Sequence, residues 1–356
     1  MIKVNRKVTM AIISFRPGNW MTRKFSYIEN QFYMMRRLYK IFHPEIFQGS
    51  QGLSDYFEGW YFKNVSKDLK HAVAFIPGIS LSDDPHSFVQ FIDGINGKTA
   101  YFRYETQDFA SDKHRFLTKI GRSEFSSEEI SLDLQNDKWK IEGKLQYEGL
   151  VRLPKSILMP GIMGWYSYVP SMECNHGVVS LDHGITGSVS VNGTVYDFTG
   201  GNGYIEKDWG VSFPESWLWL QCNNFDSPGT SIMISVAKIP WRGRYFIGLI
   251  SFLLAGGKTE IFATYNNSSV VSLRQITEKT TEIIIRRRRK RLTVTVTKSS
   301  SGSIVAPVQG KMSNMIRESI DSDVSFTYDD GSGSVIKEDG KRAGYEEMEK
   351  IFSYFK

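Results

Sequence analysis

One stretch of the chain gathers carboxyl, amine and indole side chains behind a run of glycines. Residues 200–210 read Gly-Gly-Asn-Gly-Tyr-Ile-Glu-Lys-Asp-Trp-Gly, and residues 213–225 add Glu215, Trp217 and Trp219. Glycine allows tight turns and close approach of the backbone to other groups. Carboxyl groups can transfer protons, and large aromatic side chains line apolar cavities. The stretch therefore indicates a site for proton chemistry or for binding an apolar ligand.

Part of this pattern occurs a second time upstream. The order acid, any residue, tryptophan, apolar residue, aromatic residue is found at 58–62 and again at 215–219, 157 residues further along. This separation is about the length of one domain. We interpret it as two related β modules, each opened by such a strand.

Short strand-like segments dominate the rest of the chain. They recur from Gly59 to Gln146 and again from Trp217 to Tyr328, and the 23 Phe, 17 Tyr and 8 Trp suit β-sheet cores. Asp-Gly and Asn-Gly pairs within 92–98 favour hairpin turns. We therefore predict a mainly β protein that forms antiparallel barrels or sandwiches. The predicted domains are 43–212 and 213–356, after a basic extension over 1–42.

Both ends of the chain predict helices. Residues 1–42 contain nine Lys/Arg and one acid, so this extension carries a net charge of +8 while the whole chain carries +6. An apolar stripe at helical spacing predicts an amphipathic helix over 25–42. Two interpretations are open: a helix docked on its own domain, or a peripheral membrane contact with anionic lipid. A short amphipathic helix is expected at the C-terminal end, from the spacing of Tyr345, Met348, Ile351, Phe352 and Phe355.

Several classes of protein are excluded or disfavoured. No apolar run reaches the roughly 18–20 residues that span a bilayer. The cysteines, Cys174 and Cys222, lack a metal-like spacing and favour a reduced, cytoplasmic setting. His176, Asp182 and His183 have no further ligand at a recognisable spacing, so we expect no metal. We expect no other cofactor, and no nucleic acid as a partner, because the basic charge lies in the extension.

A long apolar loop interrupts the strands at 154–175. It is rich in Pro, Gly, Met and aromatic residues. Such a loop is typical of a lid or mouth over a cavity, and also of a segment packed between two domains. The sequence supports both interpretations.

Three motifs resemble the signatures of the tocopherol cyclase family. They are Phe57–Lys63, Tyr204–Gly210 and Phe213–Asn223, in the same order as in the plant and cyanobacterial members. Asp208 is a departure, because the plant enzymes have Asn there. The resemblance covers roughly 43–350 and implies two lipocalin-like β-barrel domains, related to carotenoid hydratases.

The resemblance also implies a reaction, the cyclisation of a prenylated quinol to a chromanol. A carboxylic acid would protonate an alkene, and a phenolic oxygen would capture the resulting cation. Burial against aromatic surface can keep such an acid protonated near neutral pH. Glu206 and Asp208 are the candidate acids, with Glu58 in reserve. The candidate ligand-binding residues are aromatic: Trp60, Tyr61, Tyr204, Trp209, Trp217 and Trp219.

Other interpretations of the same residues stay open. The acids and Lys207 could form ion pairs that tie barrel ends and domains together, with the tryptophans filling a barrel floor. The protein could be a non-catalytic, lipocalin-like carrier of an isoprenoid or lipid. A third class is hydration of an alkene, which would use the same acid but admit water. A carboxyl group with a raised pKa facing the cavity would favour an enzyme, and a wholly apolar cavity would favour a carrier.

Overall fold

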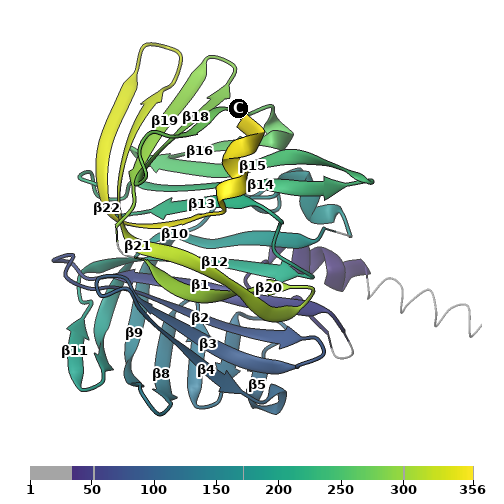
Figure 1. Cartoon of the computed structure of the whole chain (residues 1–356), viewed down its shortest axis with the longest axis vertical. Helices are drawn as coiled ribbons and strands as arrows, with labels where there is room; N and C mark the ends of the chain where they lie inside the picture. Colours follow the sequence, from purple (N-terminus) through teal and green to yellow (C-terminus); the bar gives the residue numbers. More distant parts are fainter. Residues whose placement is uncertain (1–33, 51–52, 171, 300, 356) are drawn as a thin grey trace, which may run out of the picture. The chain divides into compact units, whose positions relative to one another are not determined.

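A computed structural model describes residues 34–50, 53–170, 172–299 and 301–355, and two antiparallel β-sheets dominate these residues (Figure 1). The prediction of a mainly β protein is therefore confirmed. Among the residues that the structure describes, no helix combines the length and the hydropathy needed to cross a membrane. The cytoplasmic location stays a prediction.

The first sheet contains twelve of the described strands, and they pair in the order β4-β3-β2-β1-β12-β10-β9-β8-β7-β6-β5, with β11 beside β10. Their inward side chains form one core around Trp60, Phe62, Phe75 and Phe125. The strands are β1 (Tyr56–Val65), β2 (Ala72–Leu81), β3 (His86–Asp93), β4 (Lys98–Tyr104), β5 (Phe109–Ser111), β6 (Leu117–Ile120), β7 (Ser123–Ser126), β8 (Glu129–Gln135), β9 (Lys140–Val151), β10 (Cys174–Val191), β11 (Thr194–Asp197) and β12 (Gly201–Gly210).

The second sheet contains ten of the described strands in the order β16-β15-β14-β13-β22-β21-β19-β18-β17, with β20 beside β21. It has a core of its own, built largely from Leu, Ile, Val and Phe. The strands are β13 (Trp217–Cys222), β14 (Ser231–Trp241), β15 (Arg244–Ala255), β16 (Lys258–Ala263), β17 (Ser269–Gln275), β18 (Thr280–Arg287), β19 (Lys290–Thr297), β20 (Gly302–Val308), β21 (Lys311–Asp329) and β22 (Val335–Glu347). The chain thus forms two lipocalin-like antiparallel modules.

A third apolar cluster lies where the two modules meet. It draws Tyr61 and Tyr204 from the first sheet and Trp217, Trp219 and Phe252 from the second. The hairpin of β20 and β21 leaves the second sheet and packs on β2, β3 and β4 of the first (Figure 1). Residues 41–356 form one compact unit. The division into separate domains at 212–213 therefore stays a prediction, although the chain changes sheets between β12 and β13.

Buried polar contacts also join the modules. The backbone N–H of Val305 donates to Gln90 Oε1 over 2.8 Å, and Gln90 Nε2 donates back to the Val305 carbonyl over 2.9 Å. Lys63 Nζ, on β1, donates to Gln221 Oε1, on β13, over 2.8 Å. Because an unpaired buried polar group costs about 1–3 kcal/mol, such bonds fix how the modules sit together.

Helices are few among the described residues. Residues 34–42 are helical, which agrees with the end of the predicted N-terminal helix, while 25–33 lie outside the described residues. The membrane contact proposed for this helix stays a prediction. The short 3-10 helices are η1 (Thr106–Asp108), η2 (Gly164–Tyr168), η3 (Thr264–Asn266) and η4 (Glu349–Phe355).

Two segments differ from the sequence prediction. The C-terminal helix begins at Glu349, and Tyr345 belongs to β22, where it pairs with Leu220 of β13. The helical spacing between Tyr345 and the later apolar residues therefore does not reflect a helix, because it runs across the end of a strand and the start of a helix. The cluster at 201–210 is itself a strand, β12, whereas the sequence analysis treated it as a glycine-rich turn leading into a site.

Candidate active site

A cavity of about 180 Å³ lies at the junction of the two modules. Its walls are mainly apolar and aromatic. They carry four carboxyls and one imidazole: Glu206, Asp208, Glu318, Glu346 and His176. Of the candidate aromatic residues, Tyr61, Trp217 and Trp219 also line it.

The period of two in β12 decides which of its residues reach the cavity. Successive side chains of a strand point to opposite faces of the sheet. Tyr204, Glu206 and Asp208 therefore share the face toward the junction, and the last two line the cavity. Ile205 and Lys207 point the other way, where Ile205 belongs to the first module's core. One strand thus supplies the site and part of a core.

Strands β1 and β13 follow the same rule. On β1, Gly59 and Tyr61 line the cavity, and they pair with Asp208 and Glu206 of β12, respectively. Trp60, between them, lies in the core of the first module. On β13, alternate residues face the junction, while those between them fill the second module's core.

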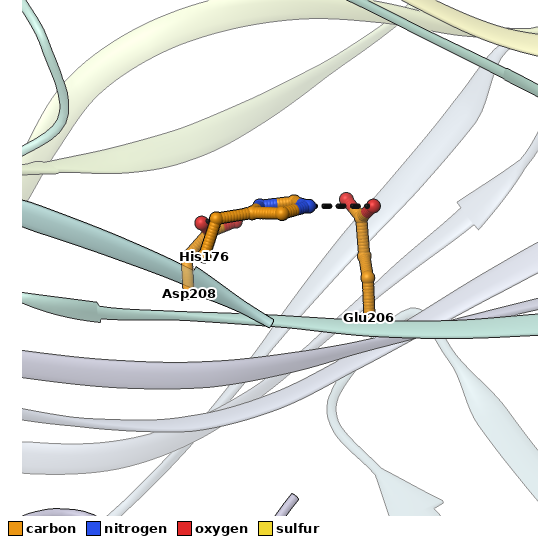
Figure 2. A group of neighbouring side chains, drawn as sticks. All are labelled: His176, Glu206 and Asp208. Atoms are coloured by element: carbon orange, nitrogen blue, oxygen red, sulfur yellow. Dashed lines mark hydrogen bonds and ion pairs between the residues drawn. The ribbon is translucent and has the colours of Figure 1, made fainter. Parts of the chain in front are cut away.

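His176 of β10 lies between two carboxyl groups of β12 (Figure 2). Its Nδ1 is 2.9 Å from Asp208 Oδ1, and its Nε2 is 3.4 Å from Glu206 Oε2. Burial disfavours the protonated ring, but the Asp208 and Glu206 carboxylates more than offset this and raise the pKa of His176 to about 10. The imidazole is therefore a cation at neutral pH.

We expect the His176 imidazole to stay protonated at pH 8. The folded protein binds this proton more tightly than the unfolded chain, whose reference pKa is 6.5. The associated stability is therefore complete below pH 6.5 and is lost as pH rises through about 10. NMR titration of labelled histidines would check this, with His176→Gln for assignment and the exposed His114 as the comparison. A midpoint near 6.5 for His176 would contradict the expectation.

Glu206 Oε2 also accepts two hydrogen bonds from aromatic residues. The Tyr204 hydroxyl donates over 2.6 Å and the Trp219 indole N–H over 3.2 Å. Burial, and then the Glu206 charge, raise the pKa of Tyr204 well above its usual value, so this phenol keeps its proton. Together with His176, these donors hold one carboxylate in a fixed position on the cavity wall.

A second acidic group comes from the other module. Glu318 of β21 and Glu346 of β22 are directly paired across the two strands, and both line the cavity. The Tyr61 hydroxyl donates to Glu318 Oε1, and the Trp217 indole N–H donates to Glu346 Oε2 over 2.9 Å. Burial, followed by the Glu346 charge, raises the pKa of Glu318 well above its usual value. Burial raises the pKa of Glu346 to about 7.

Glu58, the reserve acid, lies outside the cavity wall. Its fully buried carboxylate forms an ion pair with Lys207. It also accepts hydrogen bonds from the Gln48 and Gly49 backbone N–H groups over 2.7 and 2.9 Å, and from the Tyr56 hydroxyl over 2.6 Å. These contacts occupy both oxygens of the carboxylate, as the structural interpretation expects.

Two of the candidate tryptophans belong to this buried pair rather than to the cavity lining. The Lys207 ammonium lies 4.5 Å from the ring centre of Trp60 and 5.1 Å from that of Trp209. Trp60 is buried, donates to the Glu45 carbonyl over 2.8 Å, and stacks on Phe116 in the first core. Neither tryptophan is among the residues that line the cavity.

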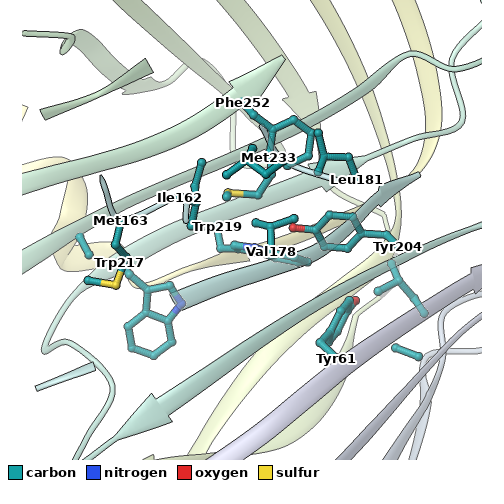
Figure 3. Close-up of a cluster of buried hydrophobic side chains, with 14 of the residues drawn as sticks. Tyr61, Ile162, Met163, Val178, Leu181, Tyr204, Trp217, Trp219, Met233 and Phe252 are labelled. Atoms are coloured by element: carbon teal, nitrogen blue, oxygen red, sulfur yellow. The ribbon is translucent and has the colours of Figure 1, made fainter. Parts of the chain in front are cut away.

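Most of the remaining wall is apolar. Figure 3 shows the buried apolar cluster to which Tyr61, Met163, Trp217 and Trp219 of this wall belong. The loop 154–175 contributes Met163, Tyr166 and Met172, so its described part combines both interpretations, covering the cavity and packing between the modules. The Tyr265 hydroxyl of η3 holds this loop through the Ile162 carbonyl over 3.0 Å. The figure shows Met163 beside Trp217 at this wall.

Three side chains at the site could accept a metal ion by distance. One possible ligand atom from each of His176, Glu206 and Asp208 lies within 4.8 Å of the others. The imidazole, however, approaches the two carboxylates through different ring nitrogens. A single metal ion would bind only one of these nitrogens, so the geometry favours a protonated imidazole between two anions.

Sequence reasoning missed two of the acids. It weighed His176 as a metal ligand or as a hydrogen-bonded histidine near the domain junction, and gave it no part in the chemistry. Glu318 shares a strand face with Met312 and Ile316, which was a usable signal, but the exposed Met315 obscures the alternation. Glu346 lay in a segment predicted as helix. Its pairing with Glu318 follows the register of the β21–β22 hairpin, because the two register shifts between Ser319 and Val324 cancel.

The fold and the site define a two-sheet β protein with carboxyl groups on an apolar cavity, and comparison with known sequences assigns it to a family. A family profile described as tocopherol cyclase-like matches residues 154–346, over half of the chain. The chain belongs to the tocopherol cyclase-like family. This confirms the resemblance seen in the three motifs.

Individual proteins match over shorter regions. The chloroplastic tocopherol cyclase of Zea mays is 31% identical over 113 residues, covering 31% of this chain and 20% of that protein. A probable chloroplastic tocopherol cyclase of Oryza sativa subsp. japonica is 32% identical over 75 residues, covering 21% and 16%. The matched regions thus span a fifth or less of these relatives. The crystal structure of CghA shares the fold, with a TM-score of 0.51 at 12% identity, covering 83% of this chain and 89% of that one.

Proposed function

We propose that the protein is an enzyme that cyclises a prenylated quinol, or a related isoprenoid, by protonating an alkene. The observation that carries the proposal is the set of carboxyl groups on an otherwise apolar, aromatic cavity wall. A carrier of apolar ligands gains nothing from buried acids, because each costs free energy to bury. An acid-catalysed enzyme needs them. Membership of the tocopherol cyclase-like family supports the same reaction class.

The proposed reaction is an isomerisation. A carboxylic acid gives its proton to one alkene carbon, the π bond breaks, and a tertiary cation forms on the other carbon. The substrate's phenolic oxygen then forms a C–O bond to that carbon and loses its proton to a base. No atom is gained or lost overall, so neither an oxidant nor a cofactor is required.

The cavity walls supply the other requirements of this chemistry. Tyr61, Trp217 and Trp219 place electron-rich rings at the wall, and such rings attract a developing cation. Tyr61 and Trp219 meet edge to face, with ring centres 5.3 Å apart. Apolar side chains from both modules limit the access of water, which would otherwise capture the cation as an alcohol.

The test is turnover of a short prenylated hydroquinone with one trisubstituted alkene, followed by chromatography and mass spectrometry. We expect a product of unchanged mass and altered retention in H₂O. In D₂O the product should carry one deuterium on carbon, because the alkene receives its proton from an exchangeable acid. Glu148→Gln is the matched control, since this carboxylate is exposed and away from the cavity.

Two other outcomes would overturn the proposal in distinct ways. A ligand that binds and is extracted unchanged would identify a carrier. A product heavier by one water would identify a hydratase, which uses the same acid but lets water reach the cation.

A further inference from the structure

The Glu318–Glu346 pair differs from every other buried acid at the cavity in its partners. Within the described residues, neither carboxyl forms an ion pair with Lys, Arg or His. Glu318 is fully buried, and its Oε2 has no hydrogen-bond partner within the described residues. A buried carboxyl oxygen without a partner favours the protonated form of its group, since burial penalises the charge.

The surroundings of the pair add negative charge. Each carboxyl pairs with the other across the β21–β22 ladder, and Glu206 and Asp208 of the first module line the same cavity. Two neighbouring carboxyls cannot both ionise without strong repulsion, so at least one keeps a proton. This is consistent with the raised pKa of both groups.

The cationic side chains nearest to this pair have other partners. His176 lies between Asp208 and Glu206. Lys63, whose pKa burial lowers to about 8, donates to Gln221 Oε1. Tyr61 is a neutral donor, because burial and then the Glu318 charge raise its pKa well above the usual value. No described side chain therefore neutralises the pair by direct ion pairing.

Glu206 has the opposite environment. Two hydrogen-bond donors and the His176 ring surround its Oε2. These contacts fix the position of the Glu206 carboxyl oxygens on the cavity wall, and we assign this group the role of receiving the phenolic proton. The cavity thus has a proton-holding wall from the second module and a proton-accepting wall from the first.

We infer that the Glu318–Glu346 pair holds a proton at neutral pH and delivers it to the substrate's alkene, while the His176–Glu206–Asp208 cluster accepts the proton of the phenol. This inference rests on the proposed function. In the first step a carboxyl O–H bond breaks and an alkene C–H bond forms, which leaves a carboxylate on the pair. In the second step the C–O bond forms and the phenolic proton moves to Glu206. Glu206 then releases its proton to solvent, and the pair takes one up from solvent, which restores the starting state.

The first test needs no substrate. Infrared spectroscopy of the wild-type protein at pH 7 should show the C=O stretch of a protonated carboxyl group, shifted in D₂O. The band should be lost or displaced in Glu318→Gln and Glu346→Gln, and unchanged in Glu148→Gln. A wild-type protein without this band overturns the inference, whatever its activity, and this result does not depend on any variant folding.

The second test compares turnover in the same variants. We expect each Gln variant to lose about a hundredfold or more in rate, because removal of a general acid costs roughly 10²–10⁴. If the wild type turns over and both variants keep its rate within twofold, the pair is not the donor. If the band is present and the wild type converts no prenylquinol, the proposed function and the delivery step both fail, while the protonated pair itself is confirmed.

Discussion

Replacing Glu206 with Gln should lower the turnover of a prenylated hydroquinone by about 10²–10⁴ while leaving the fold intact. The amide keeps the size of the side chain, and its oxygen can still accept from Tyr204 and Trp219. It cannot take up the proton that the phenol loses when the C–O bond forms. Initial rates measured by chromatography would give the loss of turnover. Circular dichroism and thermal melting would show whether the fold is intact.

The companion variant Asp208→Asn tests whether Asp208 acts on the rate only through His176, and not as the base itself. Asp208 contacts His176 through the ring nitrogen that faces away from Glu206, so its loss acts through the imidazole. We expect a smaller fall in rate than in Glu206→Gln, together with a lower pKa for His176. If Glu206→Gln keeps the wild-type rate and folds normally, Glu206 is not the base, and the proton must leave the phenol by another route.

Replacing Lys207 with Met should destabilise the protein by about 3–5 kcal/mol, because it leaves the Glu58 carboxylate buried without its cation. Both side chains of the pair are fully buried. The ammonium also donates to the Pro44 carbonyl over 2.9 Å and to the Ile46 carbonyl, so the chain before β1 would lose its anchor. The free energy of unfolding in urea would measure the loss.

Two further variants identify the cause. Adding Glu58→Gln to Lys207→Met removes the unpaired charge and should recover part of the loss, as a double-mutant cycle would show. Lys119→Met breaks an exposed pair with Glu124 and should cost at most about 1 kcal/mol. A Lys207→Met protein as stable as Lys119→Met would contradict the structural role of the buried pair.

The sequence predicted the fold class well because the signals for it are local. Alternating apolar residues, hairpin turns and the repeated acid–tryptophan pattern each need only a few neighbouring residues. The same patterns ranked Glu58 behind Glu206 but could not show that Glu58 lies outside the site, because each acid lies in a strand with aromatic residues. What separates them is parity and register: Glu58 pairs with Trp209 and Tyr61 pairs with Glu206, so only one of the two acids reaches the junction.

The remaining parts of the candidate site depend on contacts between distant segments. Glu318 meets Glu346 only when β21 and β22 pair as a long hairpin, and Tyr61 meets Glu318 across 257 residues of chain. No single-sequence pattern reports such a contact. His176 was visible in the sequence, but its partners were not, because they become neighbours only when β10 pairs with β12.

The closure of each module has a consequence for when the site can exist during folding. In each module an early strand pairs with a late one: β1 with β12, and β13 with β22. Contacts between such distant segments form slowly, because the chain must first lose the entropy of a long loop. Glu346 lies on β22, the last strand that the structure describes. During synthesis the cavity therefore stays incomplete until this strand has left the ribosome.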